Sequence, residues 1–402
     1  MKVLFAHLSA NTRSEYNVHK IIAENVDPKQ IDCFFIWQSN PANPASNPVA
    51  KLANSNRNFY YDFGRNFQLV PKPSHLRRAF MMLRQLPGSV LFLIRKIKEI
   101  KPDVIYTSQQ KWEIKLVGIA CFFVPTPRLI HLHYMVGPWL GRSAFKAILK
   151  SNHLVAVSEF IRQGAIKVGI QPANINSLLN PVDLVRFNVP KDPAWLRKEF
   201  GWPPETQVVV AAGRLDPDKG IMILLEAFAK VQVELPITRL LICGETTTRY
   251  GYDRLLKDKA AALGLSSYVT FAGSRKDLPQ IFAGANLFCL PTQNDAMPLV
   301  FLEAMLSELP VVAFRSGGVP EIVVDGVTGL LSEVEDLNGL ATNLLRVLKE
   351  PTLAKQMSMA GKSRVLSEFT PEKVSAKWAE LLNKYLSNSS YRIALASQKP
   401  SL

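Results

Sequence analysis

The chain has 402 residues, more than the roughly 250–300 at which a single hydrophobic core stops growing, so two domains are expected. Hydrophobic residues make up 48% and charged residues 20%, the composition of an ordinary globular protein. The formal net charge is +15, and no apolar stretch approaches the ~20 residues of a membrane-spanning helix, which excludes an integral membrane protein.

Short apolar runs rich in branched residues recur along the chain and alternate with helical segments. The runs are 3–5, 130–132, 154–157, 208–212, 240–243 and 287–290. Because they are continuous rather than alternating, they predict parallel strands buried on both faces. The pattern predicts two doubly wound α/β domains, each with a ligand crevice at the carboxyl ends of its strands.

Basic residues are concentrated in the first half. Residues 1–190 hold 24 Lys and Arg against 10 Asp and Glu, whereas residues 191–402 hold 24 against 23. Two segments, 75–84 and 90–98, mix basic and bulky apolar side chains and are separated by Pro87-Gly88. They predict a pair of helices, either core helices with solvated basic faces or a surface for an anionic membrane leaflet. No nucleic-acid-binding motif is apparent, so no nucleic-acid partner is expected.

Residues 129–134 predict a strand that ends with histidines at its carboxyl edge. Side chains alternate along a strand, so His131 and His133 share one face. One interpretation is a hydrogen-bonded structural pair, and the other places His133 at the crevice. The four cysteines stand far apart with no Cys-x-x-Cys pair, which predicts reduced core thiols in a cytosolic protein.

The predicted domain boundary falls at 190, where prolines and turn formers gather between 190 and 204. The first domain is then 1–190 and the second 191–370. A helix over 371–387 is expected to begin with Pro371, and residues 388–402 are expected to form a tail.

Residues 213–220, GRLDPDKG, place two cations between the run 208–212 and a helical segment that begins at 221. Arg214 can bind two phosphate oxygens and Lys219 supplies a point charge, while backbone N–H groups face the same turn. The turn predicts a diphosphate site, and the alternative is a tight loop with solvated charges. Asp216-Pro217-Asp218 also matches a metal-binding Asp-x-Asp, but Asp218 is expected to cap the helix that follows.

A second polar loop follows the run 287–290. Pro298 is expected to begin a helix, with Asp295 in the loop before it and Glu303 little more than one turn inside it. The free N–H groups of Leu299 and Val300 would form another helix end that favours anions. The two carboxylates can converge on one ligand only through this loop and helix together.

The order and spacing of GRLDPDKG, DAMPLVFLEAM, GGVPEIV and DGVTGL resemble the retaining glycosyltransferases of family 4. The segments KPDVIY at 101–106, AVSE at 156–159 and NPVD at 180–183 extend the resemblance more thinly over nearly the whole chain. The family adopts the GT-B fold, two doubly wound Rossmann-like domains that face across a crevice. The resemblance implies an N-terminal domain for the acceptor, a C-terminal domain for the nucleotide sugar, and a last helix that crosses back to the first domain.

The resemblance also implies roles for individual residues. Arg214 and Lys219 match the cations that hold the donor diphosphate in place of a metal, Glu303 matches a carboxylate that binds the ribose, and His133 matches a histidine that contacts the sugar. Asp295 stands where the family usually has a glutamate that addresses the sugar. The implied catalytic set is His133, Asp295, Arg214 and Lys219, and the implied donor-binding set is Gly213, Arg214, Lys219, Asp295, Met297, Pro298, Leu299, Val300 and Glu303.

Two departures from the family pattern fall in the predicted site. Asp295 is shorter than glutamate by about one C–C bond, roughly 1.5 Å, which alters hydrogen-bond reach. The loop over 9–15 lacks the family's adjacent glycines, and Arg13 with Ser14 is expected to contact the phosphate or the acceptor instead.

These observations predict a retaining hexosyltransferase that uses a nucleotide sugar as co-substrate and needs no metal or other cofactor. The expected acceptor is a hydroxyl of a glycan or a lipid-linked molecule in envelope polysaccharide synthesis. The expected location is the cytoplasm, with the basic domain peripheral on the inner face of the membrane. Two alternatives stay open: a GT-B-fold epimerase, and a catalytically impaired protein that binds sugar nucleotides.

Overall fold

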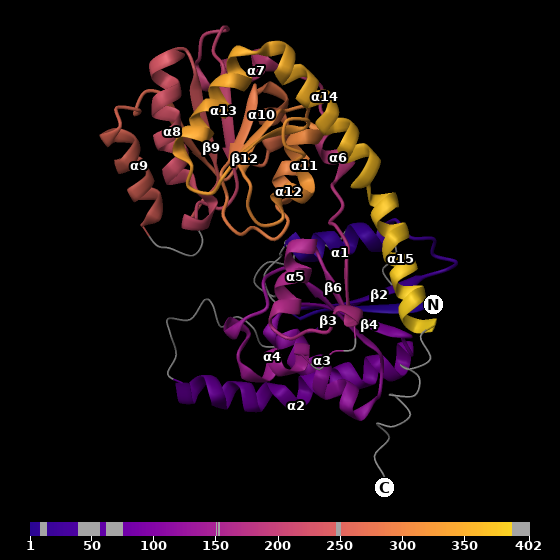
Figure 1. Ribbon diagram of the computed structural model, residues 1–402. Coiled ribbons are helices and arrows are strands. Elements are labelled where there is room, and N and C mark those ends of the chain that lie inside the picture. Colours follow the sequence, from indigo (N-terminus) through magenta and orange to yellow (C-terminus); the bar gives the residue numbers. More distant parts are fainter. Residues whose placement is uncertain are drawn as a thin grey trace. The chain divides into compact units, whose positions relative to one another are not determined.

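The computed structural model describes residues 1–8, 14–38, 57–61, 75–149, 151, 153–246 and 251–387. The chain divides into two compact units (Figure 1). The first comprises Met1–Leu179 with Glu372–Leu402, and the second comprises Asn180–Pro371.

The division falls earlier than position 190. The Asn180 N–H donates to Met297 Sδ at 3.0 Å, and the Val182 N–H donates to the Phe369 carbonyl at 3.0 Å. These two bonds attach the segment after Leu179 to the second unit. Proline and glycine content could not reveal the boundary, because it is set by pairing with residues more than a hundred positions away.

The first unit is built on seven parallel strands in the order β3-β2-β1-β4-β5-β6-β7. Their bounds are β1 Lys2–His7, β2 Asp32–Gln38, β3 Asn58–Tyr61, β4 Val104–Ser108, β5 Arg128–Leu132, β6 Leu154–Ala156 and β7 Ile175–Ser177. The strand order reverses between β1 and β4, so this is the topological switch point, where such sheets bind ligands.

Helices cover both faces of this sheet (Figure 1). The helices are α1 Ser14–Glu24, α2 His75–Ile100, α3 Lys111–Phe123, α4 Arg142–Leu149, α5 Glu159–Lys167, α15 Pro371–Ser387 and the 3-10 turns η4 Pro138–Leu140 and η5 Pro172–Asn174. Leu4 and Ala6 of β1 face α2 and α3 in one core cluster. Phe5 points to the opposite face, where Trp378 of α15 stacks on it with ring centroids 5.7 Å apart.

The prediction of two helices in this region is wrong, because the single helix α2 runs unbroken through Pro87. A proline inside a helix removes one hydrogen bond and clashes with an earlier carbonyl. Here the apolar face that includes Val90, Leu93 and Ile97 is buried in the core, and this packing offsets the loss. Gly88 lies close to Tyr61, since a Cβ atom at this position would be 2.9 Å from the Tyr61 hydroxyl.

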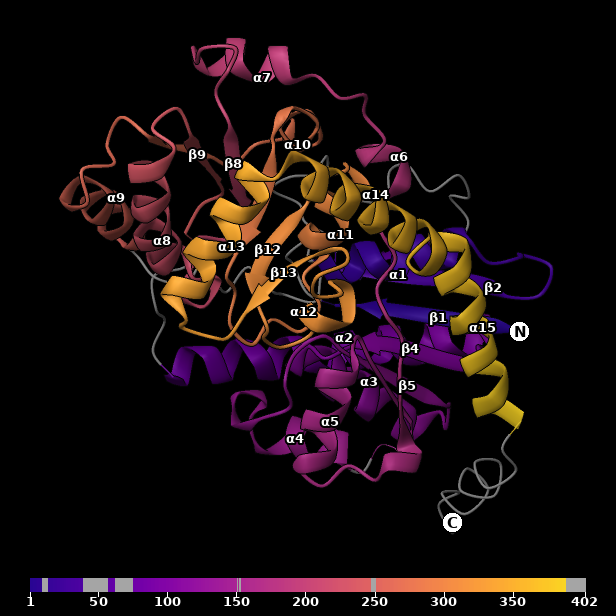
Figure 2. The same cartoon turned by 45° about the horizontal axis from the view of Figure 1, so that its top comes forward.

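The second unit is built on six parallel strands in the order β10-β9-β8-β11-β12-β13 (Figure 2). Their bounds are β8 Val208–Ala212, β9 Arg239–Cys243, β10 Val269–Gly273, β11 Leu287–Leu290, β12 Val311–Phe314 and β13 Gly329–Ser332. The helices are α6 Leu184–Phe187, α7 Pro193–Phe200, η6 Pro217–Lys219, α8 Ile221–Glu234, α9 Tyr252–Ala262, α10 Leu278–Gly284, α11 Leu299–Leu306, α12 Val319–Ile322, α13 Leu337–Lys349 and α14 Pro351–Glu368. The order reverses between β8 and β11.

The strand predictions are confirmed, since five of the six apolar runs form or lie within a parallel strand, and the sixth, 154–157, contains β6. Cys33, Cys121, Cys243 and Cys289 are free and buried, as the cysteine spacing predicted. Among the helices in the described ranges, none combines the length and the apolar character needed to cross a membrane.

Candidate functional site

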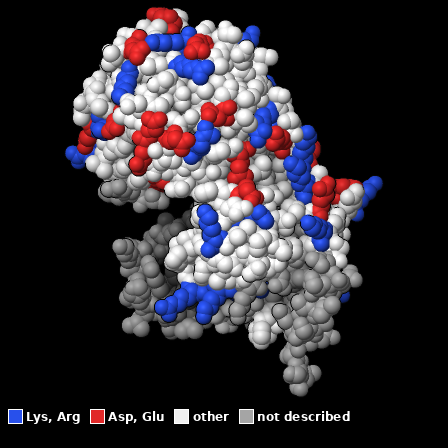
Figure 3. Space-filling model, viewed as in Figure 1, with Lys and Arg blue, Asp and Glu red and all other residues white. Residues whose placement is uncertain are grey.

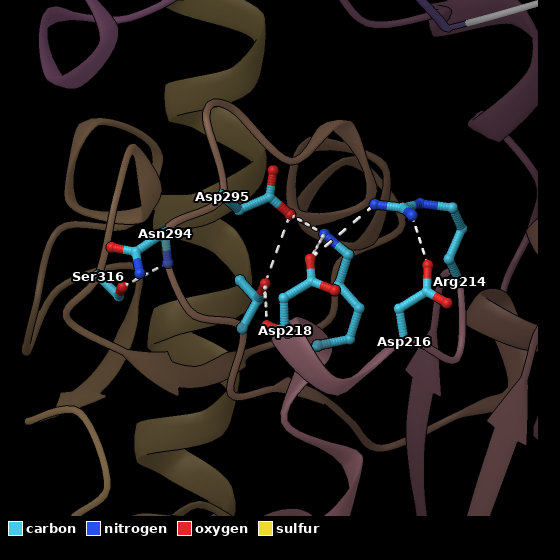
Figure 4. Close-up of polar contacts among 8 residues, drawn as sticks. Arg214, Asp216, Asp218, Asn294, Asp295 and Ser316 are labelled. Carbon is cyan, nitrogen blue, oxygen red and sulfur yellow. Dashed lines mark hydrogen bonds and ion pairs between the residues drawn. The ribbon is translucent and has the colours of Figure 1, made fainter. Parts of the chain in front are cut away.

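The loop after β8 carries the two predicted cations, and both are paired with carboxylates of the second unit (Figure 4). The Arg214 guanidinium contacts Asp216 directly and lies 3.9 Å from Asp218. The Lys219 ammonium contacts Asp295 and lies 3.5 Å from Asp218. Arg214 is 47% exposed and Asp218 is 48% exposed. The other members are less accessible, since Asp216 is 2% exposed, Lys219 10% and Asp295 17%. The exposed pair of Arg214 with Asp218 is therefore the weakest, and an incoming anion reaches the guanidinium there first.

The loops that follow β8 and β11 are joined across the switch point. The Gln293 N–H donates to the Asp218 carbonyl at 2.7 Å, and Thr292 Oγ1 donates to the same carbonyl at 3.1 Å. Together with the contact between Lys219 and Asp295, these bonds fix both loops at the carboxyl ends of adjacent strands. The structure therefore brings Arg214, Lys219 and Asp295 together.

The expectation that Asp218 caps helix α8 is wrong. Gly220 occupies the N-cap of α8 with φ +71°, and no side chain caps that end. A Cβ atom at Gly220 would lie 2.0 Å from the Pro291 carbonyl oxygen. The glycine therefore allows the β8 loop to approach the end of β11, and the Asp218 carboxylate stays beside the two cations instead.

The Asp295 loop rests on the segment after β12, a support that the sequence analysis missed. The Asn294 N–H donates to Ser316 Oγ at 2.9 Å (Figure 4), and the Gly318 N–H donates to the Asp295 carbonyl at 2.8 Å. Gly317 has φ +58°, and a Cβ atom there would lie 2.2 Å from the Asp295 carbonyl oxygen. The adjacent glycines in the sequence were the available signal for this close approach.

Helix α11 begins at Leu299 with Pro298 at its N-cap, one residue later than predicted, so Leu299 and Val300 form its first turn. The side chain of the buried Met297 accepts a hydrogen bond from the Asn180 N–H.

Glu303 lies in the second turn of α11, near Arg186 and Asp183. Burial raises the pKa of the Glu303 carboxyl to about 7, although the positive charge of Arg186 opposes this shift. The group therefore exchanges its proton near neutral pH, unlike an ordinary surface glutamate. Such a carboxyl can both donate and accept hydrogen bonds in that range.

The first unit has a buried carboxyl at its own switch point, which the sequence analysis also missed. Glu113 of α3 accepts hydrogen bonds from the Leu8 N–H at 3.1 Å, the Tyr16 hydroxyl at 2.5 Å, the Ser108 N–H at 3.1 Å and the Ser108 hydroxyl at 2.6 Å. Burial raises the pKa of Glu113 to about 7. The carboxyl ties the end of β1 to the end of β4.

His133 follows β5 directly, and its ring lies 4.3 Å from that of His131, so the two histidines share one face as predicted. His133 is buried, and burial lowers its pKa to about 3, which keeps the imidazole neutral at physiological pH. Arg13 lies outside the described residues, and Ser14 is the first residue of α1.

Two family models match the chain and together span most of it. Residues 195–364 match the model described as glycosyl transferases group 1, and residues 49–186 match the model described as glycosyltransferase family 4.

Solved structures of the same architecture include HepE of Anabaena in complex with UDP-glucose. Its TM-score is 0.77 at 23% identity, and the alignment covers 96% of this chain and 100% of that one. Two doubly wound units with these switch-point loops define a protein of the GT-B fold. The two family matches add the particular assignment: the chain belongs to glycosyltransferase family 4.

Curated relatives match over shorter spans. An N-acetyl-alpha-D-glucosaminyl L-malate synthase of Bacillus anthracis is 26% identical over 231 residues, which are 58% of this chain and 59% of that protein. A GDP-mannose-dependent phosphatidylinositol monomannoside mannosyltransferase of Mycolicibacterium smegmatis is 31% identical over 255 residues, which are 61% of this chain and 65% of that protein. The matches thus span less than two thirds of either relative.

Proposed function

We propose that the chain transfers a sugar from a nucleoside-diphosphate sugar to a hydroxyl acceptor, with retention of anomeric configuration. The observation that carries this proposal is the pair Arg214 and Lys219 at the β8–β11 switch point, held beside the Asp295 loop. The mannosyltransferase relative depends on GDP-mannose and HepE binds UDP-glucose, which supports a nucleotide-sugar donor.

The donor diphosphate would replace the carboxylates that pair with the two cations. Arg214 offers a planar fork for two phosphate oxygens, and Lys219 offers a point charge. As the glycosidic bond breaks, negative charge grows on the leaving phosphate, and these fixed cations stabilise it most in the transition state. The leaving phosphate then helps to deprotonate the acceptor hydroxyl on the same face of the sugar.

The carboxyls have separate tasks in this proposal. Asp295, released from Lys219, faces the sugar ring and stabilises its developing positive charge. Glu303 binds the donor ribose hydroxyls, for which a carboxyl with a pKa of about 7 can donate or accept. His133, as a neutral imidazole, hydrogen-bonds a sugar hydroxyl.

Metal independence is part of the proposal. Asp216 and Asp218 form the Asp-x-Asp sequence, but Asp216 is paired with Arg214, and Asp218 lies beside both cations. The positive charge that a divalent ion would bring to the diphosphate is thus supplied by side chains. Full turnover in excess chelator is the expected result, and turnover that chelator abolishes and Mg²⁺ restores would contradict it.

An anionic membrane surface is proposed as the place of action, with a lipid-linked or glycan acceptor. Phe122 and Phe123 at the end of α3 are 77% and 62% exposed, in the unit that carries most of the positive charge. On the second unit, Figure 3 shows acidic and basic side chains interspersed. The four free cysteines support a reducing, cytoplasmic location.

Vesicle binding tests the membrane proposal. The chain is expected to bind phosphatidylglycerol vesicles at low salt, and F122S/F123S is expected to bind more weakly. V233S removes an apolar side chain of the second unit that is 83% exposed and serves as the control. Absence of binding by the unmodified chain at low salt would contradict the proposal.

Turnover with and without acceptor tests the reaction. Purified protein is incubated with UDP-, GDP- and ADP-sugars, and products are followed by mass spectrometry and by NMR of the anomeric proton. Acceptor-dependent transfer with retained configuration is expected. Conversion of the donor sugar without an acceptor would instead indicate an epimerase, and donor binding without turnover would indicate a binding protein.

A further inference from the structure

Four histidines meet inside the first unit. His7 ends β1, His19 lies on α1, His131 lies in β5 and His133 follows it. All four are buried. His7 Nε2 lies 3.0 Å from His19 Nδ1, His19 Nε2 lies 3.0 Å from His131 Nδ1, and His133 Nε2 lies 3.4 Å from the same His19 Nε2.

Hydrogen bonding among the rings does not satisfy this arrangement. In a neutral imidazole each nitrogen either donates one proton or accepts through one lone pair, yet His19 Nε2 faces both His131 Nδ1 and His133 Nε2. Within the described residues, His7 Nδ1 and His131 Nε2 are buried without a hydrogen-bond partner. Three ring nitrogens thus converge where hydrogen bonding can satisfy only one contact of His19 Nε2, so the convergence calls for a ligand.

The spacing fits three nitrogen ligands of one metal ion. For tetrahedral zinc with Zn–N bonds of about 2.0–2.1 Å, neighbouring ligand nitrogens lie about 3.3 Å apart. The two separations at His19 Nε2 are 3.0 and 3.4 Å, and one ligand atom from each of His19, His131 and His133 lies within 4.8 Å of the others. We propose that His19, His131 and His133 form a binding site for a divalent transition-metal ion of the zinc class.

His7 supports this site as the outer partner of a ligand. With Nε2 bound to the ion, His19 carries its proton on Nδ1 and donates it to His7 Nε2. The His7 ring is itself held by Tyr16, which stacks on it with centroids 4.1 Å apart, and by Trp37, which meets it edge to face at 4.6 Å. The orientation of His19 is therefore fixed before an ion arrives.

Three imidazoles leave the fourth coordination position open. His133 is the only one of the three ligands with measurable exposure, at 8%, so the ion enters from its side. This consequence rests on the proposed function: an ion on His133 Nε2 takes the lone pair that would contact the sugar. Zinc is then an inhibitor of transfer and not a requirement, in line with the full turnover expected in chelator.

The test uses the full chain without a histidine tag. Equilibrium dialysis against ZnCl₂ is expected to give one ion per chain, and Co²⁺ is expected to give the intense visible bands of a tetrahedral site. X-ray absorption at the zinc edge should show three imidazole nitrogens at about 2.0 Å. These measurements on the unmodified chain do not depend on whether any variant folds.

Variants identify the ligands. H19Q, H131Q and H133Q are each expected to weaken zinc binding at least about tenfold, and H7Q about 10–100-fold as an outer partner. H153Q changes a histidine that packs on Tyr385 outside the cluster, and it is expected to bind zinc like the unmodified chain. Circular dichroism confirms that each variant is folded.

Two results would overturn the site: no stoichiometric zinc on the unmodified chain, or zinc binding that H153Q weakens as much as H19Q does. Neither result touches the proposed function, because acceptor-dependent transfer is measured separately in chelator. Conversely, stoichiometric zinc binding by a chain that transfers no sugar would support the metal site and exclude its role as an inhibitor.

Discussion

The two units use their switch points in opposite ways. At the β8–β11 switch point, two cations are paired with carboxylates, and Arg214 and Asp218 are about half exposed, so an anion can reach the Arg214 guanidinium. At the β1–β4 switch point, the polar groups are buried and held by fixed hydrogen bonds to Glu113. An accessible guanidinium suits a site that binds an anion, whereas a buried carboxyl that accepts backbone N–H bonds positions the backbone.

The largest expected effect on activity comes from removing the cations Arg214 and Lys219. R214A and K219A should each lower kcat/KM by about 10²–10³, the usual loss when one donor to developing charge is removed. R346A is the matched control, because Arg346 of α13 is 50% exposed and forms an ordinary surface pair with Glu350. Steady-state kinetics measure the difference. Equal losses of kcat/KM in R214A and R346A would contradict the proposal that the β8 loop stabilises the leaving diphosphate.

Two glycine-to-alanine variants separate the contact of Gly317 with the Asp295 loop from the backbone strain that any side chain causes at positive φ. G326A adds a side chain at φ +74° where nothing lies within 4 Å, so its cost should be about 1–2 kcal/mol. G317A meets the Asp295 carbonyl oxygen and should cost about 1–3 kcal/mol more. Urea unfolding measures both values. Equal destabilisation by the two variants would show that the close approach is not important.

The buried carboxyl of the first unit is tested by E113Q. The amide can no longer accept from all the donors around it, and a buried unsatisfied group costs about 1–3 kcal/mol. E99Q changes an exposed glutamate of α2 and should have little effect. Chemical unfolding gives the comparison, and a neutral E113Q would contradict the proposed positioning role.

A smaller effect should appear in the pH dependence of stability. Glu113 and Glu303 have pKa values of about 7, raised by burial from 4.5. Between pH 4.5 and 7 the folded chain therefore binds more protons than the unfolded chain, and the free energy of unfolding falls as pH rises. E113Q and E303Q should each flatten this fall between pH 4.5 and pH 7. Unchanged slopes in both variants would contradict the raised pKa values.

Much of the fold could be predicted because its signals are local. Continuous apolar runs such as 208–212 predict buried strands, and the cations at 214 and 219 follow the end of such a strand. The pairing of Lys219 with Asp295, the Glu113 hydrogen bonds and the histidine cluster could not be predicted. Their long-range contacts, such as Lys219 with Asp295, Leu8 with Glu113 and His19 with His133, join residues 76 to 114 positions apart. Only the strand order brings these residues together.

Local rules also failed where packing overrode them. Pro87 predicted a helix end, but the buried face of α2 keeps the helix whole. Asp218 is a good capping residue by type, yet Gly220 takes the N-cap because only glycine fits beside Pro291. In both places a tertiary contact decided the outcome.

Protection by nucleotide sugars against thermal unfolding tests the central claim most directly. R214Q/K219Q removes the two site cations, and R346Q/K349Q removes two surface cations of the same unit. At 100 times its dissociation constant a donor adds about 2.7 kcal/mol, or about 5–10 °C for a unit of this size. We predict this shift for the unmodified chain and for R346Q/K349Q, and none for R214Q/K219Q. An equal shift in a folded R214Q/K219Q would show that the diphosphate is bound elsewhere.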